Sequence, residues 1–117
     1  MKLRDVIERL ALENLTPTLT GPLAAEVRAG YATDLLSDIL AHAPAGALGV
    51  TIQAHLNVVA VALHAQLAAV VLAGGRRPEA AVVARAAEEG VVLLATAASA
   101  FDVCGRLYEL GLRGTAT

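Results

Sequence analysis

The sequence predicts a single three-layer α/β/α domain with a mostly parallel sheet of about four to five strands, and three observations lead to that prediction. Short apolar runs bounded by glycine, at residues 48–52 and 69–73, are typical of buried strands. Between them, residues 56–67 form an apolar stretch without Asp, Glu, Lys or Arg, which favours a buried helix. Strand, helix and strand in succession make a parallel βαβ unit.

The segment before this unit predicts a covering helix and an edge strand. Residues 2–12 carry apolar side chains at helical spacing, so we expect an amphipathic helix on one sheet face. Residues 13–22 are rich in turn formers and could include a short strand near Leu15. Residues 27–31 could form an extended edge segment.

A second helix should follow that edge segment and end near His42, ahead of Pro44. Thr33 or Asp34 would cap its start, because short polar side chains accept hydrogen bonds from the first free amides of a helix. Four apolar residues of this helix are expected to face the core: Leu35, Leu36, Ile39 and Leu40.

After the central unit, the sequence predicts a helix, a third apolar strand and a last helix. Residues 79–89 should be helical and end at Gly90, and residues 91–95 form the strand. Ser99 could cap a helix over residues 100–110. Its expected apolar stripe consists of Phe101, Cys104, Leu107 and Tyr108. Residues 113–117 should form a frayed tail.

Composition excludes several classes of protein. The chain has 117 residues, 56% of them hydrophobic, which is enough for one core of one domain spanning residues 1–117. A net charge of -2 disfavours nucleic-acid binding. The single cysteine, Cys104, excludes an internal disulfide and fits a reducing cytoplasm. We also expect no membrane span, because polar side chains interrupt residues 56–73.

Polar and small residues gather where the predicted parallel strands end. Because ligands of open α/β sheets bind outside the carboxyl ends of the strands, we interpret this edge as a candidate site for an anionic ligand. Helix starts there would point backbone amides at a phosphate or carboxylate. Ordinary turn and capping chemistry is the alternative explanation for each residue. The candidate ligand-binding residues are Asp34, Ser37, Thr51, Gln53, His55, Asn57, Gly74, Gly75 and Thr96.

No catalytic or metal-binding motif accompanies this edge. The sequence lacks GxxxxGK[ST], GxSxG, HExxH and CxxC patterns, so no enzyme class is indicated. His42, His55 and His64 do not have the spacing of metal ligands. Catalysis by His55 with Asp34 or Asp38 is the remaining enzymatic hypothesis, and it requires these groups to lie within hydrogen-bond reach.

Three segments resemble a stand-alone DRTGG domain: residues 30–38 (GYATDLLSD), residues 50–57 (VTIQAHLN) and residues 73–78 (AGGRRP). The closing GRLYELG, residues 105–111, is also similar to this family. The resemblance implies the three-layer fold of the N-terminal domain of HPr kinase/phosphorylase. It also implies a regulatory role, since DRTGG domains are found beside CBS domains in regulated pyrophosphatases and in phosphotransacetylases.

The chain departs from the family pattern at its name-giving residues. The Asp-Arg pair would fall at about Ala54-His55, and the Thr-Gly-Gly becomes Ala73-Gly74-Gly75. Stand-alone relatives are associated with hydrogenase and redox operons, and the names they carry include iron-sulfur-binding hydrogenase and serine kinase. One cysteine and no phosphate-binding loop contradict both activities for this chain alone.

Three functional hypotheses follow. The first is a non-catalytic regulatory or interaction module that binds an anionic ligand, such as an adenine nucleotide, at the strand ends. The alternative is a structural or partner-binding subunit without a small ligand, associated with a hydrogenase or redox system. The third is an enzyme. We also predict a homodimer, because the helix at residues 56–67 is apolar on all sides and one sheet face covers only part of it.

Overall fold

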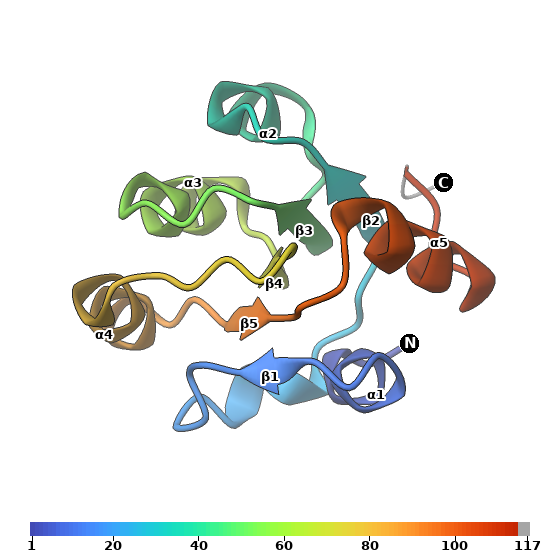
Figure 1. Ribbon diagram of the computed structural model, residues 1–117, viewed down its shortest axis with the longest axis horizontal. Coiled ribbons are helices and arrows are strands. Elements are labelled where there is room, and N and C mark those ends of the chain that lie inside the picture. The colour runs from blue at the N-terminus through green and yellow to red at the C-terminus, as the bar shows by residue number, and fades with distance from the viewer. Residues whose placement is uncertain (115–117) are drawn as a thin grey trace.

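The computed structural model describes residues 1–114 and has the predicted three layers (Figure 1). Its middle layer is a five-stranded sheet in the order β1-β5-β4-β3-β2. Four neighbouring strands are parallel, and β1 at one edge runs antiparallel to β5. The strands are β1 (Glu13–Asn14), β2 (Ala29–Ala32), β3 (Ala47–Thr51), β4 (Ala69–Leu72) and β5 (Leu93–Ala95).

Helices cover both faces of the sheet. On one side lie α2 (Leu36–His42), α3 (Asn57–Ala65) and α4 (Ala80–Glu89), which Figure 1 shows stacked along the left. On the other side lie α1 (Leu3–Arg9) and α5 (Ala100–Glu109), and a short 3-10 helix, η1 (Gly21–Ala24), packs beside α1. The predicted fold class is therefore confirmed.

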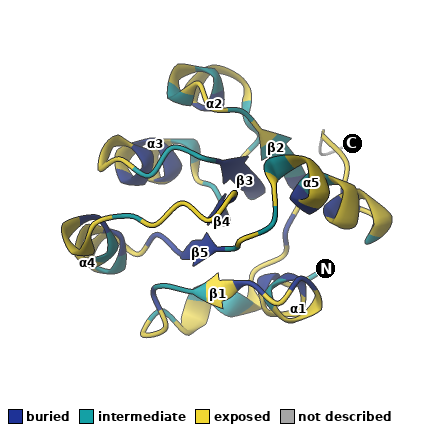
Figure 2. Ribbon diagram, viewed as in Figure 1, coloured by how far each residue is buried: buried dark blue, intermediate teal, exposed yellow. Residues whose placement is uncertain are grey.

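The core consists of two apolar clusters that the sheet separates. Along β4, Val71 faces the cluster beneath α1 and α5, while Val70 and Leu72 face the cluster beneath α3 and α4. This alternation follows from the two-residue period of a strand. Because both faces are covered, the central strands are buried throughout, as the dark blue of β3 and β5 in Figure 2 shows.

Most elements predicted from the sequence are present with shifted ends. The buried strands begin or end within two residues of their predicted positions, and the short strand near Leu15 is β1. Ser99 caps α5, because its Oγ accepts a hydrogen bond from the Asp102 amide at 3.1 Å. Gly90 ends α4 with a φ of 77°.

The cap predicted for α2 is wrong. The helix begins at Leu36, and the residue at its cap position is Leu35, whose apolar side chain cannot accept hydrogen bonds from the first amides of the helix. Thr33 forms a hydrogen bond before the helix begins, because its Oγ1 accepts from the Leu35 amide at 3.1 Å. Asp34 does not cap the helix, because its carboxylate is bonded to the end of β3.

Two predicted apolar faces are partly wrong. Ile39 of α2 is buried, but Leu40 of the same helix is 52% exposed, and Leu35, just before the helix, is 64% exposed. In α5, Leu107 is buried, whereas Phe101 is 86% and Tyr108 is 60% exposed. Helical spacing defines a face, and it does not say how much of that face the sheet covers.

The end of the described chain is tied to the sheet. The amide of Gly30 in β2 donates to the carbonyl of Arg113 at 2.9 Å, and the Arg113 guanidinium lies 3.7 Å above the Tyr108 ring. The predicted fraying is therefore wrong for Arg113. Gly114 is the last described residue, and the part of the prediction that concerns residues 115–117 lies outside the described residues. Within residues 1–114, no helix is long and apolar enough to cross a bilayer.

Candidate functional site

The candidate site lies at the edge of the sheet where β2, β3, β4 and β5 end. These strands are parallel, so the loops that follow them meet along one edge. Figure 1 shows the helices α3 and α4 beginning beyond these loops.

Asp34 and Thr51 bond to each other and to backbone. The Asp34 carboxylate accepts from the Thr51 hydroxyl at 3.2 Å and from the Ile52 amide at 3.0 Å. Thr51 Oγ1 also accepts from the Gln53 amide at 3.1 Å, and Thr51 is only 1% exposed. Both side chains thus join the loop after β2 to the end of β3.

Gly74, Gly75 and Thr96 close the neighbouring part of the edge. The Gly74 amide donates to the Ala98 carbonyl at 2.7 Å, and the Gly75 amide donates to the Thr96 carbonyl at 3.0 Å. Thr96 Oγ1 accepts from the Ala98 amide at 3.2 Å. The two glycines have φ values of 71° and 73°, which side-chain-bearing residues rarely adopt. The positive φ values are therefore needed for the shape of the loop, and both amides already donate to backbone carbonyls.

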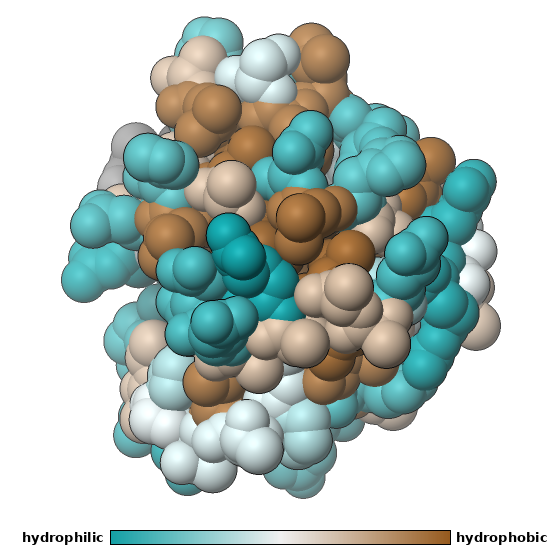
Figure 3. Space-filling model, turned by 90° about the vertical axis from the view of Figure 1, so that its left-hand side faces the viewer, coloured by the Kyte–Doolittle hydropathy of each residue, from teal (hydrophilic) through white to brown (hydrophobic). Residues whose placement is uncertain are grey.

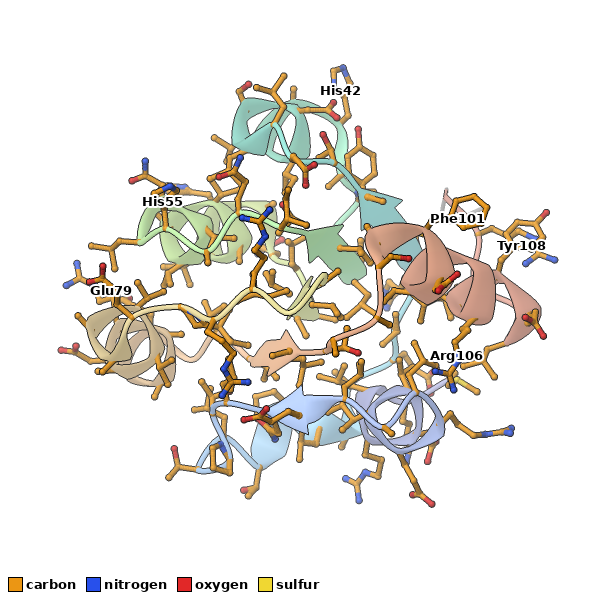
Figure 4. All side chains as sticks on the ribbon, in the orientation of Figure 1. His42, His55, Glu79, Phe101, Arg106 and Tyr108 are labelled. Atoms are coloured by element: carbon orange, nitrogen blue, oxygen red, sulfur yellow. The ribbon has the colours of Figure 1, made fainter. Side chains whose placement is uncertain are left out.

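A hollow of about 320 Å³ remains between the loops after β3 and β4. Of the nine candidates, Gln53 and His55 line it. Figure 4 places His55 at the start of α3 and Glu79 at the start of α4, on the same side of the molecule. Among residues 1–114, the residues that line it are Ile52, Gln53, Ala54, His55, Arg76, Arg77 and Glu79.

Arg76, Arg77 and Glu79 were missed as candidate residues. Arg77 binds Glu13 through two hydrogen bonds of 2.6 and 3.0 Å, which fasten this loop to β1. That pairing lowers the pKa of Glu13 and raises the pKa of Arg77. Among residues 1–114, no carboxylate forms an ion pair with Arg76. Two cations directly after a strand-ending Gly-Gly were the signal that could have indicated them.

Asn57 and Ser37 do not join this hollow. Asn57 begins α3 and lines a different depression, between α3 and α4. Ser37 is exposed in the first turn of α2 and is not among the lining residues. Seven of the nine candidates thus belong to a bonded loop junction, a closed loop pair or the open hollow, and Asn57 and Ser37 lie outside all three.

Asp38 belongs to a separate cluster at α2. Its carboxylate accepts from the Tyr31 hydroxyl at 2.9 Å and lies 3.0 Å from His42 Nδ1. The Tyr31 hydrogen bond, followed by that of His42, lowers the pKa of Asp38, and the same bond raises the pKa of Tyr31. The histidine beside Asp38 is therefore His42, whereas the enzymatic hypothesis paired His55 with Asp34 or Asp38. Among residues 1–114, no three His, Cys, Asp or Glu side chains are grouped as metal ligands.

A structural comparison matches this fold to part of the regulatory region of another protein. The solved structure is that of the CBS and DRTGG domains of the regulatory region of Clostridium perfringens pyrophosphatase, complexed with the activator diadenosine tetraphosphate. The TM-score is 0.66 over 91% of this chain, at 10% sequence identity. The fold is DRTGG-like.

The DRTGG-like chain spans 45% of that structure's length, so the match concerns one part of the regulatory region. At this identity the likeness extends to the fold and not to individual residues. No family model matches the sequence, and no curated protein matches it.

Proposed function

We propose that this chain is a non-catalytic regulatory module that binds an adenine nucleotide in the hollow between the loops after β3 and β4. The observation that carries the proposal is Arg76, a cation at the rim of a hollow that also presents Gln53 and His55. A guanidinium presents several donors to phosphate oxygens, and an amide and an imidazole can orient the remaining polar groups.

The position of the hollow supports an anionic ligand. It lies outside the carboxyl ends of two parallel strands, which is where open α/β sheets bind ligands. The helices α3 and α4 begin beside it, and their dipoles favour negative charge at their starts. Glu79 on its wall disfavours a highly charged ligand close to α4, so the phosphates are expected nearer Arg76.

The structural neighbour supports the same class of ligand. That protein is a regulatory region in complex with diadenosine tetraphosphate, an adenine-containing anion. A regulatory role is also consistent with the neighbour's position beside CBS domains in its own chain. We extend the ligand class, and not the neighbour's individual contacts, to this chain.

Calorimetry with AMP, ADP, ATP and adenosine tests the proposal. We expect Arg76→Ala to weaken binding of the phosphorylated ligands about tenfold, corresponding to about 1.4 kcal/mol, and to leave any adenosine binding unchanged. Arg106→Ala is the control, because Arg106 lies on α5, beyond the sheet from this hollow (Figure 4). Absence of heat and of a thermal shift with all four ligands would refute nucleotide binding.

The second candidate is a partner-binding subunit without a small ligand. It is favoured by the loops after β4 and β5, where the Gly74 and Gly75 amides bond to backbone carbonyls instead of facing solvent. The association with redox or hydrogenase systems that the family resemblance implies belongs to this candidate. Co-purification of a stoichiometric protein partner, together with a negative nucleotide panel, would favour it over the first.

A further inference from the structure

The outer side of α3 carries its largest apolar side chains. The buried side of the helix consists of Val58, Val59, Val61 and Ala62. Leu63, and Leu56 immediately before the helix, are instead 48% and 50% exposed. This reverses the usual arrangement of a surface helix, in which the large apolar residues face the core.

These leucines border a groove between α3 and α4. The groove has a volume of about 280 Å³, and Ala60 forms part of its wall. The charged residues on its α4 side, Arg85 and Glu89, pair with each other at 3.4 Å. Figure 3 shows apolar side chains over α2 and α3, with polar side chains between and around them. Leu40 of the neighbouring α2 and Leu35 just before it are also exposed.

We propose that two copies of this chain associate through this face, with α3 of one copy packed against α3 of the other around a two-fold axis. In such an interface each residue near the axis meets its own copy, so a charge there would face a like charge. The helix α3 contains no Asp, Glu, Lys or Arg, and its polar residues in the groove are Asn57 and His64. The two α4 charges that line the groove, Arg85 and Glu89, pair with each other. A second copy centred on Leu56, Ala60 and Leu63 therefore adds apolar contact without bringing like-charged carboxylates, guanidinium or ammonium groups together.

The charge pattern also favours a second copy over a charged partner. A partner with a strong charge of either sign needs complementary charge around the apolar centre. Arg85 and Glu89 offer one charge of each sign at the groove and already satisfy each other. On α5, by contrast, the exposed Tyr108 is stacked beneath the Arg113 guanidinium, so a copy placed there would bring cations together.

Sedimentation velocity at micromolar concentrations tests this proposal. We expect the wild-type chain to sediment at twice its 11.9 kDa mass. Leu63→Glu should raise the dimer dissociation constant at least about 30-fold, since it places two carboxylates near the axis. Ala60→Glu is a second variant at an exposed position of the same groove. Circular dichroism checks that each variant is folded.

Phe101→Glu is the matched control, because Phe101 is more exposed than either leucine and belongs to α5 (Figure 4). This variant should remain dimeric. A wild-type chain that sediments only at 11.9 kDa would overturn the proposal. The proposal would also be overturned if the Leu63→Glu and Ala60→Glu variants were folded and dimerised as tightly as the wild type. Dissociation of the dimer by Phe101→Glu, with no dissociation by Leu63→Glu or Ala60→Glu, would place the interface on α5 and would overturn the proposal as well.

Discussion

Asp34 shows how a polar residue at a strand end can serve the fold instead of a ligand. Its carboxylate joins the loop after β2 to the end of β3 by bonding Thr51 and the Ile52 amide. We expect Asp34→Ala to lower the free energy of unfolding by about 1 to 2 kcal/mol, because the buried Thr51 hydroxyl loses its acceptor. Asp34→Asn retains an acceptor oxygen and should cost less.

Urea unfolding monitored by circular dichroism measures this difference. Glu88→Ala is a suitable control, because it removes an exposed carboxylate from α4 without removing a bond to another loop. If Asp34→Ala and Glu88→Ala had equal effects, the bonds to β3 would contribute nothing to stability.

The ion pair between Glu13 and Arg77 predicts a specific dependence on pH. Arg77 lowers the pKa of Glu13 below its ordinary value of 4.5 in the folded chain. A carboxyl with a lowered folded pKa stabilises the folded state above its unfolded pKa, and this contribution is lost as the pH falls through the folded pKa. The stability difference between the wild type and Glu13→Gln should therefore shrink as the pH falls below about 4.5.

Urea titrations at a series of pH values from neutral to acidic measure that difference. Added salt should reduce it at neutral pH, because both side chains are largely exposed. A difference that stays constant through the acidic range would contradict the assigned role of the ion pair.

At this scale the sequence predicted residue types better than residue roles. Strand ends are correctly placed at Thr51 and Thr96, but their hydroxyls accept hydrogen bonds from amides two residues further along. The sequence alone does not distinguish such a turn from a ligand contact, because both need the same short polar side chain. Arg76 lies at the open hollow, and the two cations directly after Gly74-Gly75 were the signal for it. The sequence does not show which of the two arginines is bound by another part of the chain, because the partner of Arg77, Glu13, is 64 positions away.

At the scale of elements, α5 predicts a contrast between its buried and exposed apolar residues. Leu107 is 3% exposed and contacts the core beneath α1 and α5, whereas Phe101 points outward. Leu107→Ala should lower the free energy of unfolding by about 2 to 5 kcal/mol, and Phe101→Ala should change it by less than about 0.5 kcal/mol. Urea unfolding of both variants tests the contrast, and a larger loss for Phe101→Ala would show that α5 is rotated from its described position.

The elements themselves were largely predictable because the apolar runs and their glycine and proline boundaries are strong signals. The sequence did not predict which apolar helix residues are exposed, because a helical stripe can extend beyond the area that the sheet covers. These exposed residues are Leu35, Leu40, Phe101 and Tyr108. The start of α2 was also not predictable, since Thr33 forms its hydrogen bond before the helix begins.

At the scale of the whole molecule, the shared sheet predicts cooperative unfolding. Val58 and Val103 are buried on opposite faces of the sheet. We expect Val58→Ala and Val103→Ala each to lower the free energy of unfolding by about 2 kcal/mol, and their effects to add within about 0.5 kcal/mol. Circular dichroism and tyrosine fluorescence should report one coincident transition for both variants. Separate transitions for the two probes would mean that the faces unfold independently.

The three-layer architecture was predictable because a βαβ unit fixes the handedness of its crossover, and because parallel sheets are normally covered by helices on both faces. The sequence did not predict whether the edge where the parallel strands end is open to a ligand. That property depends on hydrogen bonds between loops that are distant in sequence. Gly74 and Ala98 form one such bond across the loops after β4 and β5.

The antiparallel pairing of β1 with β5 has a consequence for the order of folding during synthesis. Glu13 pairs with Ala95, and Thr16 accepts its hydrogen bond from the Leu93 amide, 77 positions later. A ribosome therefore releases the amino-terminal segment long before its binding site on the sheet exists. The βαβ segments can pair as they emerge, whereas β1 must wait until β5 has left the exit tunnel. The strand β1, which is made before the other four strands, is thus the last of the five to reach its final position.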